Sequence, residues 1–164
     1  MSFMRSTPRL LHDEHLATIA TLDAVERVLL SRRGNPPSAG DVEAQRTIVK
    51  LSRLTEGEML SHFDFEEQHL FPMLIERGDG GMTDVLSEEH DLLRETGQEL
   101  IAASKAAAES GFTPESWRDY LRLCGEMVER MIGHIQKEEM ALLPVLEDAL
   151  DPDADAELAA LHQG

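Results

Sequence analysis

Turn-forming residues divide this chain of 164 residues into four long segments. Glycine, proline, serine and asparagine gather at three places, 32–40 (RRGNPPSAG), 77–81 (RGDGG) and 110–114 (SGFTP). The segments between them are rich in Leu, Ala, Glu, Met and Arg, which favour helix, and interior proline occurs only late in the second and fourth. We therefore predict four helices, over 8–32, 41–77, 83–109 and 114–150.

Residues that favour helix N-caps precede each segment: Thr7, Asp41, Thr83 and Thr113. Long helices joined by short connections predict an all-α fold, an up-down-up-down antiparallel four-helix bundle. At this length one domain with a sizeable core is expected. We assign the bundle to residues 1–150 and a short C-terminal tail to residues 151–164.

Two segments repeat one pattern, HFDFEEQHLFPMLIE at 62–76 and HIQKEEMALLPVLED at 134–148. In each, a glutamate follows a histidine by four positions, and a proline follows the glutamate by six: His62–Glu66–Pro72 and His134–Glu138–Pro144. Positions i and i+4 share one helix face, so the imidazole and carboxylate can reach one point beside the helix. Each proline should bend its helix beyond the motif.

Two further histidines are predicted at the level of these motifs. His15 and His90 lie near the N-terminal ends of the first and third helices, whereas the motifs lie toward the C-terminal ends of the second and fourth. In an antiparallel bundle these four helix ends meet at one end. All six groups also fall on the apolar stripes, where unpaired polar residues are costly. Their coincidence favours a metal site.

Four imidazoles and two carboxylates divide evenly between two metal ions. Each ion would take two histidines, and each glutamate would bridge the pair, leaving room for an oxo or hydroxo bridge and an exchangeable position. Mixed nitrogen and oxygen ligands suit iron or manganese, and zinc could also occupy such a site. Two ions so placed could bind a small ligand, pass electrons or activate water.

Composition limits the partners and the compartment. The formal net charge of −17 argues against binding to nucleic acid or to an anionic membrane surface. Cys124 is the only cysteine, which rules out an intrachain disulfide and fits a reducing compartment. The start, MSFMRSTPRLL, lacks the features of a signal peptide, and no apolar run is long enough to span a membrane. We expect a cytoplasmic protein.

The chain resembles the hemerythrin-like (HHE, cation-binding) domain family over about residues 8–150. The resemblance rests on DEH at 13–15, HFDFEE at 62–67, EEH at 88–90 and HIQKEE at 134–139. It implies a di-iron site and a role in binding oxygen or nitric oxide, in sensing oxygen or iron, or in handling iron. It implies six metal ligands: His15, His62, Glu66, His90, His134 and Glu138.

The sequence departs from the oxygen-carrying members of that family at two places. Arg94 stands where they have a further histidine, and Glu138 follows His134 by four positions where they have an aspartate after five. The pattern resembles the bacterial type with four histidines and two glutamates, which includes iron–sulfur repair proteins. The cysteine-bearing N-terminal domain common in those is missing, so we expect neither simple oxygen storage nor complete repair activity.

Several nearby residues receive smaller roles. His69 shares the stripe of His62 and is a second-shell partner or an extra ligand, and His12 is placed at the exposed mouth of the bundle with the same two options. Glu67 and Glu139 point away from the stripe and are interpreted as surface or helix-contact charges. His162, in the tail, is given no role.

Two other classes of function stay open. One is a di-iron oxidoreductase acting on oxygen, peroxide or nitric oxide. Ferritin-like enzymes of this kind need Glu-x-x-His on two helices, and only Glu66–His69 has that form. The other is a metal-free histidine phosphotransfer bundle, which needs an exposed histidine, whereas the histidines here lie on buried stripes.

Overall fold

The computed structural model describes residues 2–164, which are helical over most of their length and contain no strand. Eight α-helices alternate with loops or with three single π-helical turns. The α-helices are α1 (Ser6–Leu30), α2 (Val42–Arg53), α3 (Met59–Phe65), α4 (Phe71–Glu76), α5 (Gly80–Ser110), α6 (Pro114–Lys137), α7 (Leu143–Ala149) and α8 (Pro152–Gln163). The π-turns are η1 (Leu54–Glu58), η2 (Glu66–Leu70) and η3 (Glu138–Leu142).

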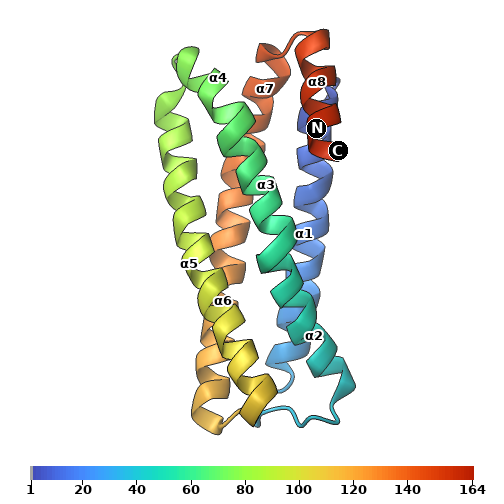
Figure 1. Ribbon diagram of the computed structural model, residues 1–164, viewed down its shortest axis with the longest axis vertical. Coiled ribbons are helices and arrows are strands. Elements are labelled where there is room, and N and C mark those ends of the chain that lie inside the picture. The colour runs from blue at the N-terminus through green and yellow to red at the C-terminus, as the bar shows by residue number, and fades with distance from the viewer. Residues whose placement is uncertain (1) are drawn as a thin grey trace.

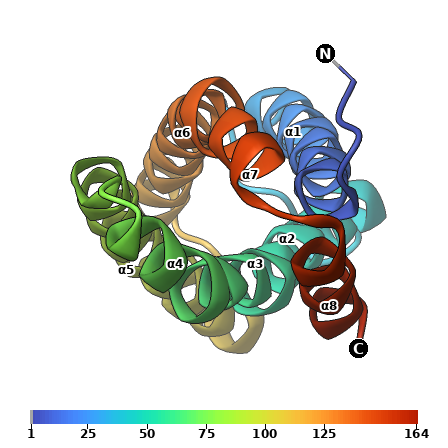
Figure 2. The same cartoon turned by 90° about the horizontal axis from the view of Figure 1, so that it is seen from above.

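These elements form the predicted all-α bundle. The run from α2 to α4 is one continuous column and the run from α6 to α7 is another, and with α1 and α5 they make four antiparallel columns (Figure 1). Viewed along the bundle, the four columns surround a common centre (Figure 2). None of the helices in the described residues is both long and apolar enough to cross a membrane.

The starts of two helices are capped as predicted. Asp41 accepts a hydrogen bond from the Ala44 N–H, and Thr113 forms a reciprocal capping box with Ser116. The other two predicted caps are wrong. Thr7 lies inside α1, which begins at Ser6, and Thr83 lies inside α5, which begins at Gly80.

The start of α1 is capped by residues from the far end of the chain. Asp155 of α8 accepts from the backbone N–H groups of Ser6 and Thr7, each at 2.8 Å. Glu147 of α7 accepts from the N–H groups of Met4 (2.8 Å) and Arg5 (3.0 Å). These carboxylates satisfy N–H groups that lack a partner inside the helix.

The last residues of the chain, predicted as a tail, form α8. This helix turns back after Asp151 and packs against α1, outside the ring of four columns (Figure 2). The side chain of Asp151 caps α8 by accepting from the Ala154 N–H at 2.8 Å.

The π-turns η2 and η3 begin at the two motif glutamates. The carbonyl of Glu66 accepts from the N–H of Phe71, and that of Glu138 accepts from the N–H of Leu143, five residues on in each case. Pro72 and Pro144 follow directly, at the starts of α4 and α7, where a missing N–H costs little. A π-turn adds a residue to one turn, so later side chains face a direction about 100° from that of an unbroken α-helix.

The interior consists of two apolar clusters separated by a polar layer. One cluster fills the half of the bundle that contains Trp117 and Tyr120. The other, containing Phe65, Leu70 and Leu146, fills the half near the α4–α5 and α7–α8 connections. Along every column the predicted metal ligands fall between residues of the two clusters.

Candidate metal centre

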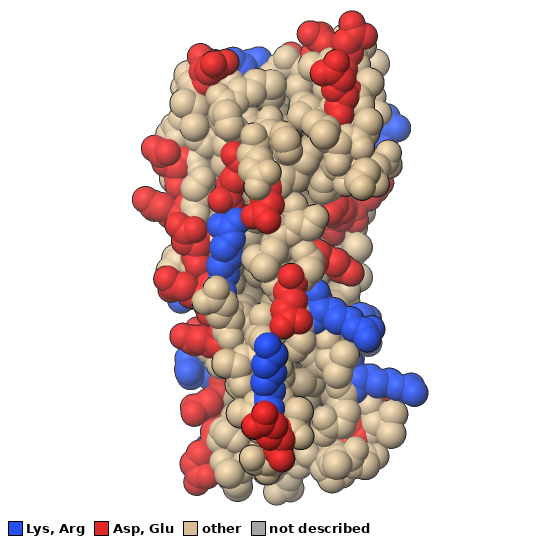
Figure 3. All heavy atoms as spheres, viewed as in Figure 1, with Lys and Arg blue, Asp and Glu red and all other residues tan. Residues whose placement is uncertain are grey.

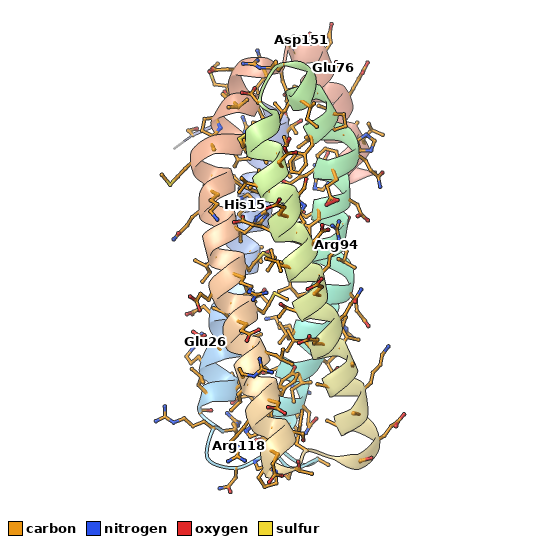
Figure 4. All side chains as sticks on the ribbon, turned by 90° about the vertical axis from the view of Figure 1, so that its left-hand side faces the viewer. His15, Glu26, Glu76, Arg94, Arg118 and Asp151 are labelled. Carbon is orange, nitrogen blue, oxygen red and sulfur yellow. The ribbon has the colours of Figure 1, made fainter. Side chains whose placement is uncertain are left out.

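The polar layer contains all six residues that the sequence singled out. All six residues are buried, with exposed fractions from 0% for Glu66, His90 and Glu138 to 8% for His62. In Figure 4, His15 points into the bundle, in the half nearer Glu76 and Asp151 and far from Arg118. Four columns therefore deliver four imidazoles and two carboxylates to one level.

The six residues form two groups that share Glu138. Ligand atoms of Glu66, His90, His134 and Glu138 lie within 4.8 Å of one another, and so do those of His15, His62 and Glu138. We call the pair His15 and His62 the first half-site, and the pair His90 and His134 the second half-site.

Each oxygen of Glu138 faces a different half-site. Its Oε2 lies 2.9 Å from Nε2 of His15 and 3.5 Å from Nε2 of His62. Its Oε1 lies 2.5 Å from Nε2 of His134 and 3.6 Å from Nε2 of His90. A carboxylate so placed can bridge two cations.

Glu66 lies between the half-sites from the opposite column. Its Oε1 is 3.4 Å from Nε2 of His62 and 3.4 Å from Nε2 of His90. Neither of its oxygens has a hydrogen-bond partner, and Oε1 of Glu138 also has none. Buried carboxylate oxygens without partners are costly, and a cation bound between the half-sites would satisfy them.

The histidine nitrogens also fit a metal. Nε2 of His15 is 3.2 Å from Nε2 of His62, and Nε2 of His90 is 3.0 Å from Nε2 of His134. Each pair of ring nitrogens thus faces one point. Imidazole and carboxylate are the ligands that iron, manganese and zinc take in proteins, so the residues present fit two such ions.

A second layer of four glutamates supports the four histidines at Nδ1. Each glutamate is the neighbour in sequence of one cluster residue but serves a histidine on a different column. Glu139 lies 2.7 Å from His15, Glu67 lies 2.8 Å from His90, and Glu89 lies 2.9 Å from His134. Glu14 lies 3.7 Å from Nδ1 of His62. Together these four contacts link each column to the next around the bundle.

Such a carboxylate keeps the imidazole proton on Nδ1 and leaves Nε2 free to bind a cation. Of the two predicted roles for Glu67 and Glu139, surface or helix-contact charges, the structure shows contacts to neighbouring helices. The sequence shows that Glu67 and Glu139 each follow a motif glutamate directly. Sequence spacing could not identify the histidines that they contact, because each of these histidines lies on a neighbouring column.

Each supporting glutamate has a second partner. Glu67 accepts from Arg94 at 2.7 Å, and Glu139 contacts Nδ1 of His12 at 2.9 Å. Glu89 pairs with Lys137, and Glu14 pairs with Nε2 of His162. The partners of the second half-site are permanent cations, whereas those of the first are histidines.

The electrostatics of the layer favour ionised carboxylates. Burial opposes the charge of Glu138, but the four histidines that face it hold its pKa well below the usual value. Burial likewise opposes the charge of His90, yet Glu138 and Glu66 raise its pKa to about 9. Burial raises the pKa of Glu14, but its bonds with His162 and His62 outweigh this and lower it to about 2. In the metal-free protein the cluster thus holds protons that a metal would displace.

The two half-sites differ in their apolar surroundings. The ring of His90 stacks on Phe63 with centroids 3.9 Å apart and faces Phe71 at 5.7 Å. A cavity of about 250 Å³ reaches the first half-site, and both His15 and His62 line it.

The cavity walls are mostly apolar, with two glutamates among them. Met59, Met131 and Ile135 contribute apolar surface, and Glu14 and Glu58 contribute the acidic groups. His134 also lines the cavity, so both half-sites lie beside space that a small molecule could fill.

Three histidines lie outside the cluster of six. His69 is exposed and rests against Phe65 at 5.6 Å, because it lies within η2, where the π-turn rotates it off the stripe of His62. The structure gives it no contact with the cluster. His12 is half-buried, not exposed, and contacts Glu139, which in turn contacts His15. His162 lies beside the first half-site, although no role was predicted for it.

The acidic composition shows on the surface. On the face in Figure 3, Asp and Glu side chains follow the edge that α5 forms in Figure 1, with few Lys or Arg between them.

Cys124 is buried far from the cluster, and burial raises the pKa of its thiol to about 12.

The model of the hemerythrin HHE cation-binding domain matches residues 7–146 and matches again over 82–163. The iron-sulfur cluster repair protein YtfE of Cronobacter sakazakii is 29% identical over 144 residues. The alignment covers 81% of this chain and 59% of that relative, so the chain spans well under two thirds of its length.

Proposed function

Because this chain belongs to the hemerythrin HHE cation-binding family, we propose that it is a non-haem di-iron protein that binds a small diatomic ligand, O₂ or NO, or handles or senses iron. The observation that carries the proposal is the pair of buried glutamates with unpartnered oxygens, enclosed by four histidines. Manganese or zinc would fit the same ligands.

In this proposal His15 and His62 would hold one ion, and His90 and His134 would hold the other. Glu138 would serve both ions, because its two oxygens face different half-sites. Glu66 would contribute to both from the opposite column. The bound iron would supply redox chemistry and open coordination positions for a small ligand.

The protein's own groups would do the remaining work. The supporting glutamates fix the orientation of each imidazole, and the cavity beside His15 and His62 admits a small molecule while its apolar walls limit water. A cavity of about 250 Å³ admits a diatomic molecule and is smaller than the roughly 300–1,000 Å³ typical of pockets for larger organic ligands.

The name of the relative supports an iron-handling role. That protein is called an iron-sulfur cluster repair protein, and this chain aligns with part of it. Delivery or removal of iron within that kind of process is the form of iron handling that we propose here. A cytoplasmic location, with its reducing conditions, fits both the binding of a diatomic ligand and the handling of iron.

Iron reconstitution tests the proposal. Protein purified without added metal and then given ferrous iron under anaerobic conditions should take up close to two irons per chain. The absorption spectrum of the oxidised protein should change on addition of azide or NO. No bound iron after reconstitution would refute the proposal, and sustained consumption of peroxide or NO would replace it with the oxidoreductase alternative.

A further inference from the structure

Three of the four supporting glutamates have a second partner on the same helix as the histidine that they support, and the fourth does not. Arg94, the partner of Glu67, lies on the same helix as the supported histidine, four residues after His90. Lys137 follows His134 by three residues on the same helix.

In the first half-site, only His15 has such a partner on its own helix. His12 precedes His15 by three residues on the same helix, so each of three histidines has one helical neighbour that anchors its carboxylate.

The column of His62 offers no such neighbour. The positions three or four residues away are Glu58, Met59, Phe65 and Glu66, none of which can donate a hydrogen bond to a carboxylate at neutral pH. The partner of Glu14 comes instead from outside the four columns. It is His162, near the end of α8.

The packing of α8 fixes His162 in that place. The side chain of His162 is only 11% exposed, and its ring lies 4.2 Å from Phe65 and 6.4 Å from His62, centroid to centroid. At the other end of the helix, Asp155 binds the backbone of Ser6 and Thr7. The helix is therefore anchored to α1 by one residue and reaches the first half-site with another.

We propose that His162 is a positioning residue for the first half-site. By donating from Nε2 to Glu14, it holds that carboxylate beside Nδ1 of His62 and supplies from α8 the anchor that the column of His62 lacks. The inference rests on the proposed di-iron function. It assigns α8 a specific task, which is to retain the ion held by His15 and His62.

The test compares three substitutions in the full-length protein. His162→Phe keeps a ring against Phe65 but removes the donor, whereas His162→Gln retains a donor at the position of Nε2. Leu161→Ala is the matched control, because Leu161 is the preceding residue and is 58% exposed. Each variant is loaded with ferrous iron, and iron content and the rate of iron loss to a chelator are measured.

We expect two kinetic phases of iron loss in the wild type, one for each half-site. In His162→Phe one phase should accelerate by up to about tenfold, the lower end of the cost of losing a group that orients a ligating histidine, because His162 acts through Glu14. The other phase should stay unchanged, His162→Gln should recover most of the loss, and Leu161→Ala should behave as wild type.

The absorption spectrum gives an independent readout. The oxidised iron-loaded His162→Phe protein should show a shifted band, because the orientation of His62 changes, and a merely structural role for α8 would not be rescued by glutamine. Wild-type kinetics and spectrum in His162→Phe would overturn the inference while leaving the function intact. Failure of the wild type to bind two irons would instead refute the function.

Discussion

The two half-sites are built from the same residue types but have different surroundings. In the second half-site, His90 is fully buried and stacked on Phe63, its supporting glutamate pairs with Arg94, and only His134 lines the cavity. The first half-site borders the cavity, and His62 has the largest exposed fraction of the six cluster residues, 8%. The same types of ligand could thus hold one ion in a more enclosed half-site and a second ion in a half-site that a small molecule can reach.

The largest expected effect comes from the residue that both half-sites share. Glu138→Ala should reduce iron content from about two per chain to less than about one half, because all four histidines face this carboxylate. Glu129→Ala, at an exposed position of α6, is the control and should retain both ions. Elemental analysis checks the result, and two ions retained in Glu138→Ala would show that Glu138 is not a shared ligand.

The next comparison separates the half-sites. His62→Ala and His90→Ala should each lose one ion, but only His90→Ala should strongly destabilise the metal-free protein, by about 2 kcal/mol, because its ring packs on Phe63 and Phe71. Urea denaturation of the two metal-free variants provides the measurement. Equal loss of stability would contradict the difference in packing.

Access to the first half-site gives a smaller, kinetic effect. Thr18→Phe narrows the cavity and should slow azide binding by about tenfold, equivalent to about 1.4 kcal/mol, without changing the iron content. Leu92→Phe, on the surface groove that borders His134, is the matched control and should leave the rate unchanged. Slowing by Leu92→Phe alone would place the open position at the second half-site.

The smallest effect concerns the attachment of α8. Asp155→Ala should destabilise the protein by about 1 kcal/mol through loss of its two bonds to the start of α1. Burial raises the pKa of Asp155, but hydrogen bonds from Thr7 and Ser6 outweigh this and lower it below 3.8. Its stabilisation is therefore full above pH 3.8 and is lost as the pH falls through the lowered value.

Stability curves of wild type and Asp155→Ala should accordingly differ at neutral pH and converge in acid. A constant difference at all pH values would mean that packing, and not the charged cap, attaches the helix. Iron loss from the first half-site should also accelerate in this variant, because α8 contributes His162 to it.

Much of the fold could be predicted because the helical segments are separated by clear turn signals. The residues gathered at the cluster could be placed at one level, since rise per residue and antiparallel order are fixed by helix geometry. The caps at Asp41 and Thr113 were also predictable, because they act within four residues.

The rest depends on contacts between distant segments. The helix α8 fully buries only Asp155 and Ala159, with Ala154 and Leu158 half-buried against the core, so its apolar stripe is too short to reveal it. The cap of α1 comes from Asp155, 149 residues beyond Ser6. The supporting glutamates act across columns, and His69 is turned outward by a π-turn that helical periodicity does not indicate.

A crystal structure of the iron-loaded protein, with anomalous scattering recorded at the iron edge, tests the central claim most directly. We predict two anomalous peaks, one between His15 and His62 and one between His90 and His134, both within bonding distance of Glu138. A single peak, or peaks that Glu138 does not join, would contradict a shared two-ion centre.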